Sequence, residues 1–189
     1  MERKQVAPVS PITILGGGGP YGAYVLRIAV ERPLLLAFGR FTGGRPIEVP
    51  AGECLYVGSA RGPGGLPPRL LRHATRTGAR PPHDIRDAMV AAFARRGWRS
   101  RPPSAKRLRW NVDHLLDRAE AEIATAVLLC SPSSGLERRV AALLAADPAV
   151  SFLARGLGAH DDPGATHVLR VDADDAWWRA LPARLADLV

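Results

Sequence analysis

Two short strand-like segments, each pairing a glycine with a tyrosine, most constrain how this chain of 189 residues can fold. One reads Gly22-Ala23-Tyr24-Val25-Leu26, and the other reads Leu55-Tyr56-Val57-Gly58-Ser59. In each segment the glycine and the tyrosine are two residues apart, so they project from the same face of a strand. If the two strands are neighbours, two phenols lie together on a surface that the glycines leave uncovered.

A predicted helix follows the second segment and carries a guanidinium and an imidazole. The run Leu-x-x-Arg-x-x-x-His covers Leu66 to His73, and its Arg69 and His73 are four residues apart. Residues at this spacing share one face of a helix. Phenols, an arginine and a histidine that converge on one patch indicate a site for a phosphate group.

The distribution of charge supports a polyanionic partner. Residues 1–110 hold 19 Lys and Arg against 6 Asp and Glu, whereas residues 111–189 hold 7 against 12, which gives the net charge of +8. Such asymmetry is typical of a polyanion-binding surface. Only Lys4 and Lys106 among the 26 basic residues are lysines, and codon bias is an alternative reason for the excess of arginine, although it does not explain the clustering.

The order of apolar runs and turns predicts one α/β (α+β) domain with a small, mainly antiparallel central sheet flanked by helices. A flexible tail is expected over residues 1–21, and a single domain over 22–189 with a basic insertion at about 78–109. The predicted strands are 22–31 and 34–41, which we expect to form a hairpin, followed by 53–59, 122–130 and 166–172. The predicted helices are 67–77, 83–96, 112–119, 133–146 and one that begins at 174–175.

Other features narrow the class of protein. Cys54 and Cys130 lie in apolar strand-like segments and are expected to be buried thiols, without a disulfide or metal-binding pattern. The apolar runs are too short to span a bilayer. We therefore expect a cytoplasmic protein with no membrane partner, while the sequence leaves the oligomeric state open.

At this point the order of motifs resembles the GIY-YIG nuclease superfamily. Its two name motifs match Gly22-Ala23-Tyr24 and Tyr56-Val57-Gly58, and its helix arginine and histidine match Arg69 and His73. The segment Trp110-Asn111-Val112-Asp113-His114-Leu115-Leu116 is similar to a segment of the compact Uri-type branch, with Asn111 where that branch has histidine and His114 where it has tyrosine. A glutamate that opens a later helix corresponds best to Glu137.

The resemblance implies the hydrolysis of phosphodiester bonds. Glu137 is the carboxylate that matches the superfamily, so it is the candidate holder of Mg²⁺ or Mn²⁺, an ion that polarises phosphate and stabilises a leaving oxygen. Arg69 offers paired donors to phosphate. The superfamily implies that one tyrosine takes the proton of water, and we favour Tyr24 as this base, with Tyr56 positioning the water or the phosphate. Nearby cations are expected to lower the phenol pKa.

Several of these residues have simpler alternative roles. The two tyrosines can be ordinary strand aromatics, and His73 can accept a phenol proton, bind phosphate or simply pack. Ser134-x-x-Glu137 has the pattern of a capping box, in which the glutamate binds the backbone instead of a metal. His160, Asp161 and His167 resemble a metal cluster only loosely, because their spacing is irregular.

The sequence thus predicts a metal-dependent endonuclease-like protein that cuts DNA, with RNA as the alternative substrate. The residues expected to contact nucleic acid are Arg61, Arg72, Arg76, Arg107 and Arg109. A catalytically inactive nucleic-acid-binding module on the same fold is the second hypothesis, which the departures at Asn111 and His114 allow. A domain that binds an acidic protein through its basic face is the third.

Overall fold

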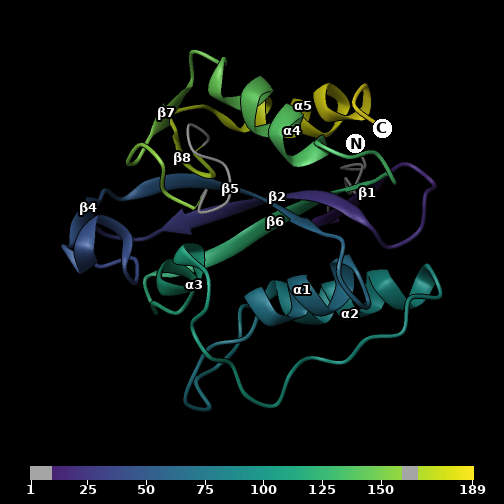
Figure 1. Cartoon of the computed structure of the whole chain (residues 1–189), viewed down its shortest axis with the longest axis horizontal. Coiled ribbons are helices and arrows are strands. Elements are labelled where there is room, and N and C mark those ends of the chain that lie inside the picture. Colours follow the sequence, from purple (N-terminus) through teal and green to yellow (C-terminus); the bar gives the residue numbers. More distant parts are fainter. Residues whose placement is uncertain (1–9, 159–165) are drawn as a thin grey trace, which may run out of the picture.

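A six-stranded sheet runs through the middle of the computed structural model, which describes residues 10–158 and 166–189 (Figure 1). One neighbouring pair, β1 and β6, is parallel, and the other neighbours in the sheet are antiparallel. In their order across the sheet, the strands are β1 (Ile12–Leu15), β6 (Ala121–Cys130), β2 (Gly22–Val30), β5 (Gly52–Ala60), β8 (Val168–Val171) and β7 (Val150–Phe152).

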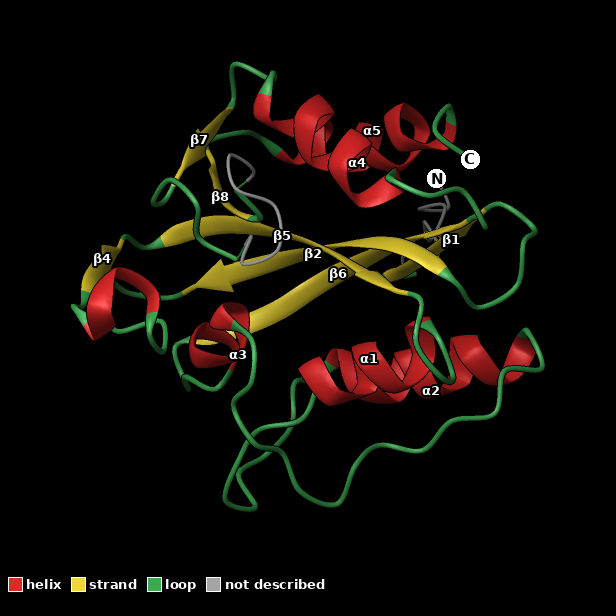
Figure 2. Ribbon diagram, in the orientation of Figure 1, coloured by secondary structure: helices red, strands yellow, loops and turns green. Residues whose placement is uncertain are grey.

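Helices cover both faces of this sheet, as Figure 2 shows in red. One face carries α1 (Leu66–His73), α2 (Ile85–Arg95) and α3 (Asn111–Leu116). The other face carries α4 (Leu136–Ala145) and α5 (Asp175–Ala186). The predicted class, α+β with a mainly antiparallel central sheet between helices, is confirmed.

The strand β2 shows why the sheet has two separate cores. Tyr24, Leu26 and Ile28 pack with α1 and α2, whereas Ala23 and Val25 pack with α4 and α5. Because successive side chains alternate between the faces of a strand, a segment that is apolar at every position must be covered on both sides. The pattern of residues 22–30, in which Arg27 is the one charged residue, therefore favours a central strand.

The predicted hairpin of residues 22–31 with 34–41 is wrong. β2 pairs with β5 and β6, whereas β3 (Leu34–Leu36) pairs with β4 (Ile47–Val49) in a separate two-stranded sheet. A short 3-10 turn, η1 (Phe41–Gly44), lies between β3 and β4. The turn signal at Arg32-Pro33 is real, but burial of both faces of β2 outweighs local pairing.

The predicted flexible tail is also wrong where the structure describes it. β1 lies inside the range 1–21 and pairs in parallel with β6, from Ile12 opposite Ala126 to Leu15 opposite Leu129. The part of this prediction that concerns residues 1–9 falls outside the described residues. Four residues with three aliphatic side chains were too short a signal to identify an edge strand.

The basic insertion contains a helix that belongs to the core. The prediction of a helix over 83–96 is confirmed by α2, which buries Met89 and Phe93 against α1 and the sheet. Cys54 and Cys130 are both buried and unpaired, also as predicted.

Gly58 makes room for the phenol of Tyr24, which lies opposite it across the β2–β5 pair. A Cβ at position 58 would lie 2.4 Å from the Tyr24 hydroxyl oxygen. We therefore predict that Gly58→Ala destabilises the fold by about 1–3 kcal/mol, as overpacking of a core does. Gly62→Ala is the matched control, because its Cβ would meet nothing within 4 Å. Urea unfolding should separate the two variants, and equal stability would contradict the close packing described.

Candidate active site

Two phenols and an imidazole form one buried cluster on the α1 face of the sheet. Tyr24 comes from β2, Tyr56 from β5 and His73 from the last turn of α1. The Tyr24 hydroxyl lies 2.8 Å from Nε2 of His73. The ring centroids of the two tyrosines are 5.9 Å apart, and that of Tyr56 is 5.7 Å from that of His73. The strand pattern thus brings the two phenols and the histidine together as the sequence predicts.

The carboxylate of Asp113, at the start of α3, organises the groups around this cluster. Arg72 donates to both of its oxygens at 2.9 Å, and the backbone amides of Arg109 and Trp110 donate to Oδ2 at 2.8 and 2.9 Å. Nζ of Lys106 lies 3.6 Å from Oδ1. Burial opposes the charge of Asp113, but hydrogen bonds from His73 and Arg72 and the charge of Lys106 hold its pKa well below the usual range.

Asp113 also fixes the tautomer of His73. Nδ1 of His73 lies 3.4 Å from Oδ1 of this ionised carboxylate, which can only accept a proton. A proton on Nδ1 therefore faces Asp113, and Nε2 is left to accept the hydroxyl of Tyr24. Burial lowers the pKa of His73 to about 4, although Asp113 opposes the shift, so the imidazole is neutral at pH 7.

The phenols themselves are not acidified in this structure. Burial is the main reason that the pKa of Tyr24 is raised well above 10.0, and the neighbouring Tyr56 adds to it. Burial and the negative charge of Glu137 likewise raise the pKa of Tyr56. Arg69 lowers the pKa of both phenols, as expected, but the larger effect of burial prevails.

Arg69 belongs to a stack of cations around an indole ring. Its guanidinium carbon lies 3.9 Å from the ring centroid of Trp110, and those of Arg72 and Arg109 lie at 4.2 and 5.2 Å. The ring of Trp110 is in turn 5.8 Å from that of His73. Cation–π attraction thus holds positive charge next to the phenol cluster.

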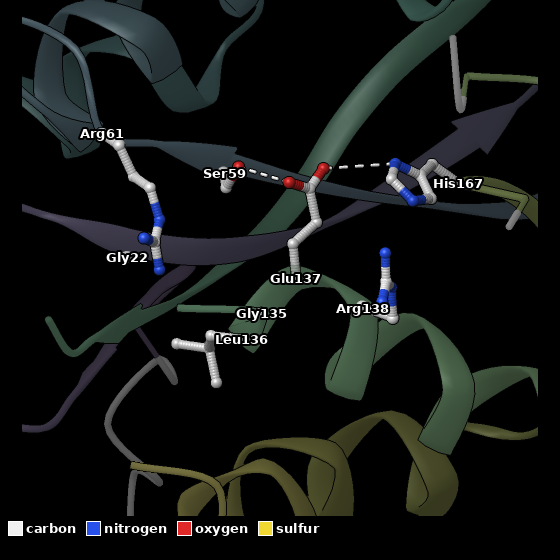
Figure 3. A pocket seen from close by; sticks show the side chains of 8 residues that line it. All are labelled: Gly22, Ser59, Arg61, Gly135, Leu136, Glu137, Arg138 and His167. Carbon is white, nitrogen blue, oxygen red and sulfur yellow. Dashed lines mark hydrogen bonds and ion pairs between the residues drawn. The ribbon is translucent and has the colours of Figure 1, made fainter. Parts of the chain in front are cut away.

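Glu137 lies on the opposite face of β5 from the two phenols. It is in the first turn of α4, and its carboxylate accepts a hydrogen bond from Ser59, whose side chain follows Leu55 and Val57 on the α4 face of the strand. Nδ1 of His167 is 3.2 Å from Oε1 of Glu137 (Figure 3). The alternative role of Glu137 in a capping box with Ser134 is not found, because Gly135 is the N-cap residue and no side chain caps this helix.

A cleft of about 370 Å³ opens beside this carboxylate. It is lined by residues of β2, β5 and α4, by the residue after β5 and by the residue before β8, and these include Gly22, Ser59, Arg61, Glu137, Arg138 and His167. Neither tyrosine is among its lining residues. The expectation that the phenols, Arg69, His73 and Glu137 meet in one pocket is therefore wrong, because they form two groups on opposite faces of β5.

The two groups still interact, because the charge of Glu137 raises the pKa of both phenols and that of Arg69 lowers the pKa of Glu137. For Glu137 itself burial acts in the opposite direction, but hydrogen bonds from His167 and Ser59 prevail and its pKa is lowered. β8 pairs with β5 only as far as Tyr56, with one further backbone bond from Val57 to His167, among the residues that the structure describes. At its end, β5 is thus the single strand that lies between the two groups of residues.

Glu137 is suited to an ion that keeps most of its water. Mg²⁺ is often held by one or two carboxylates, with water and phosphate oxygens completing its six ligands. An ionised carboxylate at an open cleft meets this requirement. Within residues 10–158 and 166–189, no three His, Cys, Asp or Glu side chains gather as a metal-binding group.

The arginines expected to bind nucleic acid differ in their surroundings. Arg61 donates to the backbone oxygen of Ser133, and Arg72 is paired with Asp113. Arg76 donates to Glu122 at 2.9 Å and to the Ala121 carbonyl at 2.7 Å, which ties it to the fold. In contrast, Arg107 and Arg109 are exposed to solvent.

Asp113, Ser59 and His167 contact predicted site residues but were not assigned roles from the sequence. Asp113 is a carboxylate in the apolar face of Val112, Leu115 and Leu116, which is an unusual place for a charge and was a usable signal. The sequence pattern places His167 only in a loose metal cluster, whose other two residues, at 160 and 161, lie outside the described residues. Nothing in the sequence pairs Ser59 with a helix that begins 77 residues later.

Comparison with known proteins identifies the family. Residues 23–188 match the model of the family described as "Domain of unknown function DUF123", so this α+β domain belongs to that family. Neither a curated protein nor a solved structure gave a match. No helix in the described part of the chain is long and apolar enough to cross a membrane.

We predict that His73 makes stability depend on pH between about 4 and 6.5. In this window the unfolded chain binds a proton at His73 and the folded chain does not, because its pKa falls from 6.5 to about 4. The free energy of unfolding should therefore decrease as the pH falls, by up to ~1.4 kcal/mol per pH unit. Asp113 stays ionised throughout, since its pKa is lowered.

His73→Gln removes this titration, so its stability should change less with pH over the same window. Urea unfolding at half-unit intervals of pH gives the two slopes, and a lower overall stability of the variant does not affect the comparison. If the free energy of unfolding changes with pH equally in the wild type and in His73→Gln, His73 is not neutral and buried in the folded state.

Proposed function

We propose that this domain is a GIY-YIG-type phosphodiesterase that cuts DNA with the help of a divalent metal ion. The chain of contacts from Tyr24 through His73 to Asp113 carries the proposal. It gives a phenol a neutral proton acceptor whose other nitrogen faces a carboxylate, which is the arrangement that activates weak nucleophiles and bases in enzymes. RNA is the alternative substrate, and a cytoplasmic location is part of the proposal.

Tyr24 acts in this scheme through its contact with His73. Transfer of the hydroxyl proton of Tyr24 to Nε2 of His73 leaves a phenolate that can take a proton from the attacking water. Asp113 stabilises the imidazolium that results, since its carboxylate stays ionised. Tyr56, which is 5% exposed and borders a separate cavity, positions the water or the phosphate.

Arg69 and Glu137 complete the scheme from opposite sides of β5. The guanidinium of Arg69, stacked on Trp110, binds a phosphate oxygen. Glu137 would hold Mg²⁺ or Mn²⁺, and such an ion, when bound, stabilises charge on the phosphate and the leaving oxygen. The scheme requires the scissile phosphate to lie at the end of β5, where the charges of Glu137 and Arg69 both act on the phenols.

One observation favours the second candidate, a nucleic-acid-binding module without cleavage. Tyr24 is fully buried and Tyr56 nearly so, and the pKa of each phenol is raised and not lowered. A phenol of this kind can act as a base only when bound substrate or metal lowers its pKa. The two candidates therefore differ in whether added metal produces cleavage.

We predict that Glu137→Gln lowers metal-dependent cleavage at least about 100-fold, because a bound metal ion supplies several kcal/mol of transition-state stabilisation. The amide keeps the size of the side chain and can still accept from Ser59. Glu48→Gln removes the same charge from the exposed strand β4 and is the control. The assay is a cleavage screen over single-stranded, double-stranded and branched DNA and RNA, with Mg²⁺ or Mn²⁺.

Calorimetric titration with Mn²⁺ measures metal binding independently of cleavage. Glu137→Gln should bind Mn²⁺ more weakly than the wild type and Glu48→Gln should not. If Glu137→Gln cleaves as fast as the wild type, the metal-dependent scheme is wrong. If nothing is cleaved but nucleic acid binds, the binding module is the better description.

We further predict that Arg107→Ala reduces the salt dependence of duplex DNA binding. The slope of log K against log salt should change by about 1, because one exposed phosphate contact is lost. Arg179→Ala, on the exposed side of α5 across the sheet, is the control and should leave the slope unchanged. Fluorescence anisotropy between about 50 and 200 mM salt measures both slopes. Equal slopes for the two variants would place the duplex on another surface.

A further inference from the structure

A second cavity, of about 530 Å³, lies on the α1 side of the sheet and is separate from the Glu137 cleft. Tyr56 forms part of its wall, so the cavity begins where the phenol cluster ends. The residues preceding α3 and those of α3 itself supply further parts of the wall, among them Trp110 and His114. Its volume is in the range of ~300–1,000 Å³ that is usual for small-ligand sites.

The wall combines flat apolar surface with positive charge. The side chain of Leu108, which is 40% exposed, and the ring of His114 supply the aliphatic and ring surfaces, while Trp110, whose ring already carries three guanidinium groups, also lines the wall. Arg40 and Arg109 supply the cations. No carboxylate lines the cavity among the residues that the structure describes. A ligand that fits has a planar ring and a negatively charged group.

The cavity is kept open next to His114 by a glycine. Gly39 has φ +62°, a conformation that other residues rarely adopt, and a Cβ there would lie 3.0 Å from Nε2 of His114. The α3 side is also held in place, because Nδ2 of Asn111 donates to the Phe38 carbonyl at 2.7 Å. The loop before η1 and the helix α3 are thus joined at one end of the cavity, which does not need to be formed by the ligand.

We propose that this cavity holds one unpaired nucleotide next to the phosphate that is cut. The base lies against the ring and aliphatic surfaces, and a flanking phosphate lies against Arg40 or Arg109. A base inside a duplex is stacked on both sides and paired at its edge, so only a single-stranded or extruded nucleotide can enter. The inference rests on the proposed function, because Tyr56 is the link between the cavity and the reacting phosphate.

The test is a binding experiment in the presence of EDTA, so that no cleavage occurs. Fluorescence anisotropy is measured with three labelled probes: a single strand of ten thymidines, a strand of the same length with ten abasic residues, and a blunt DNA duplex. The wild type should bind the thymidine strand about tenfold more tightly than the abasic strand, since stacking of even one base supplies such a factor.

The double variant Leu108→Ala, His114→Ala should lose this tenfold preference and bind the abasic strand and the duplex as the wild type does. Leu35→Ala is the control, because Leu35 is 76% exposed on β3 and does not line the cavity. Urea unfolding of each variant shows that it is folded. Equal affinity of the wild type for thymidine and abasic strands, or an equal loss on all three probes in the double variant, would overturn the proposal.

The outcome is distinguishable from failure of the proposed function. Cleavage in Mn²⁺ with no preference for the thymidine strand would overturn the nucleotide site alone. A preference that the double variant loses, in a protein that cleaves nothing, would support the nucleotide site and overturn the hydrolytic scheme. A wild type that binds none of the probes would overturn the nucleotide site.

Discussion

The buried carboxylate of Asp113 is the contact on which the arrangement of the α1 face depends. It joins three segments that are distant in the sequence: α1 through Arg72 and His73, the basic segment through Lys106, and the start of α3 through the Trp110 amide. An ionised group without these partners would be costly to bury. Because the partners are all donors or cations, Asp113 stays ionised and the segments stay together.

This internal pairing changes how the excess of arginine should be understood. Arg72 compensates Asp113, and Arg76 compensates Glu122, so these two cations belong to the fold and contribute less to a polyanion surface. The positive charge that remains for a partner is more local than the sequence indicates. Part of it lies around Trp110, where Arg69 and Arg109 are held by the indole ring next to the phenol cluster, and part lies on exposed arginines of the basic segment such as Arg107.

The parts of the site that follow from local periodicity were predictable, and the parts that follow from long-range pairing were not. Strand alternation places Tyr24 and Tyr56 each on the face of a nearby glycine, and helical spacing places His73 with Arg69, but the three side chains meet only because β2 pairs with β5, which the sequence argument took as a condition. The position of Glu137 depends instead on which face of the sheet α4 covers, and neither its metal-holding role nor the alternative capping role with Ser134 indicates that face. β1 escaped prediction for the same reason, since the strand with which it pairs lies more than 100 residues away.

Gly58 matters for a second reason, because a single strand lies between Glu137 and the phenols. Ser59 and Gly58 are adjacent, so the side chain that binds Glu137 and the position that accommodates the Tyr24 hydroxyl point to opposite faces of β5. Any side chain at position 58 would push the phenol away from the strand and lengthen the path between the two groups. A glycine there lets the Tyr24 hydroxyl lie against the backbone of β5, while on the other face of the same strand Ser59 binds Glu137.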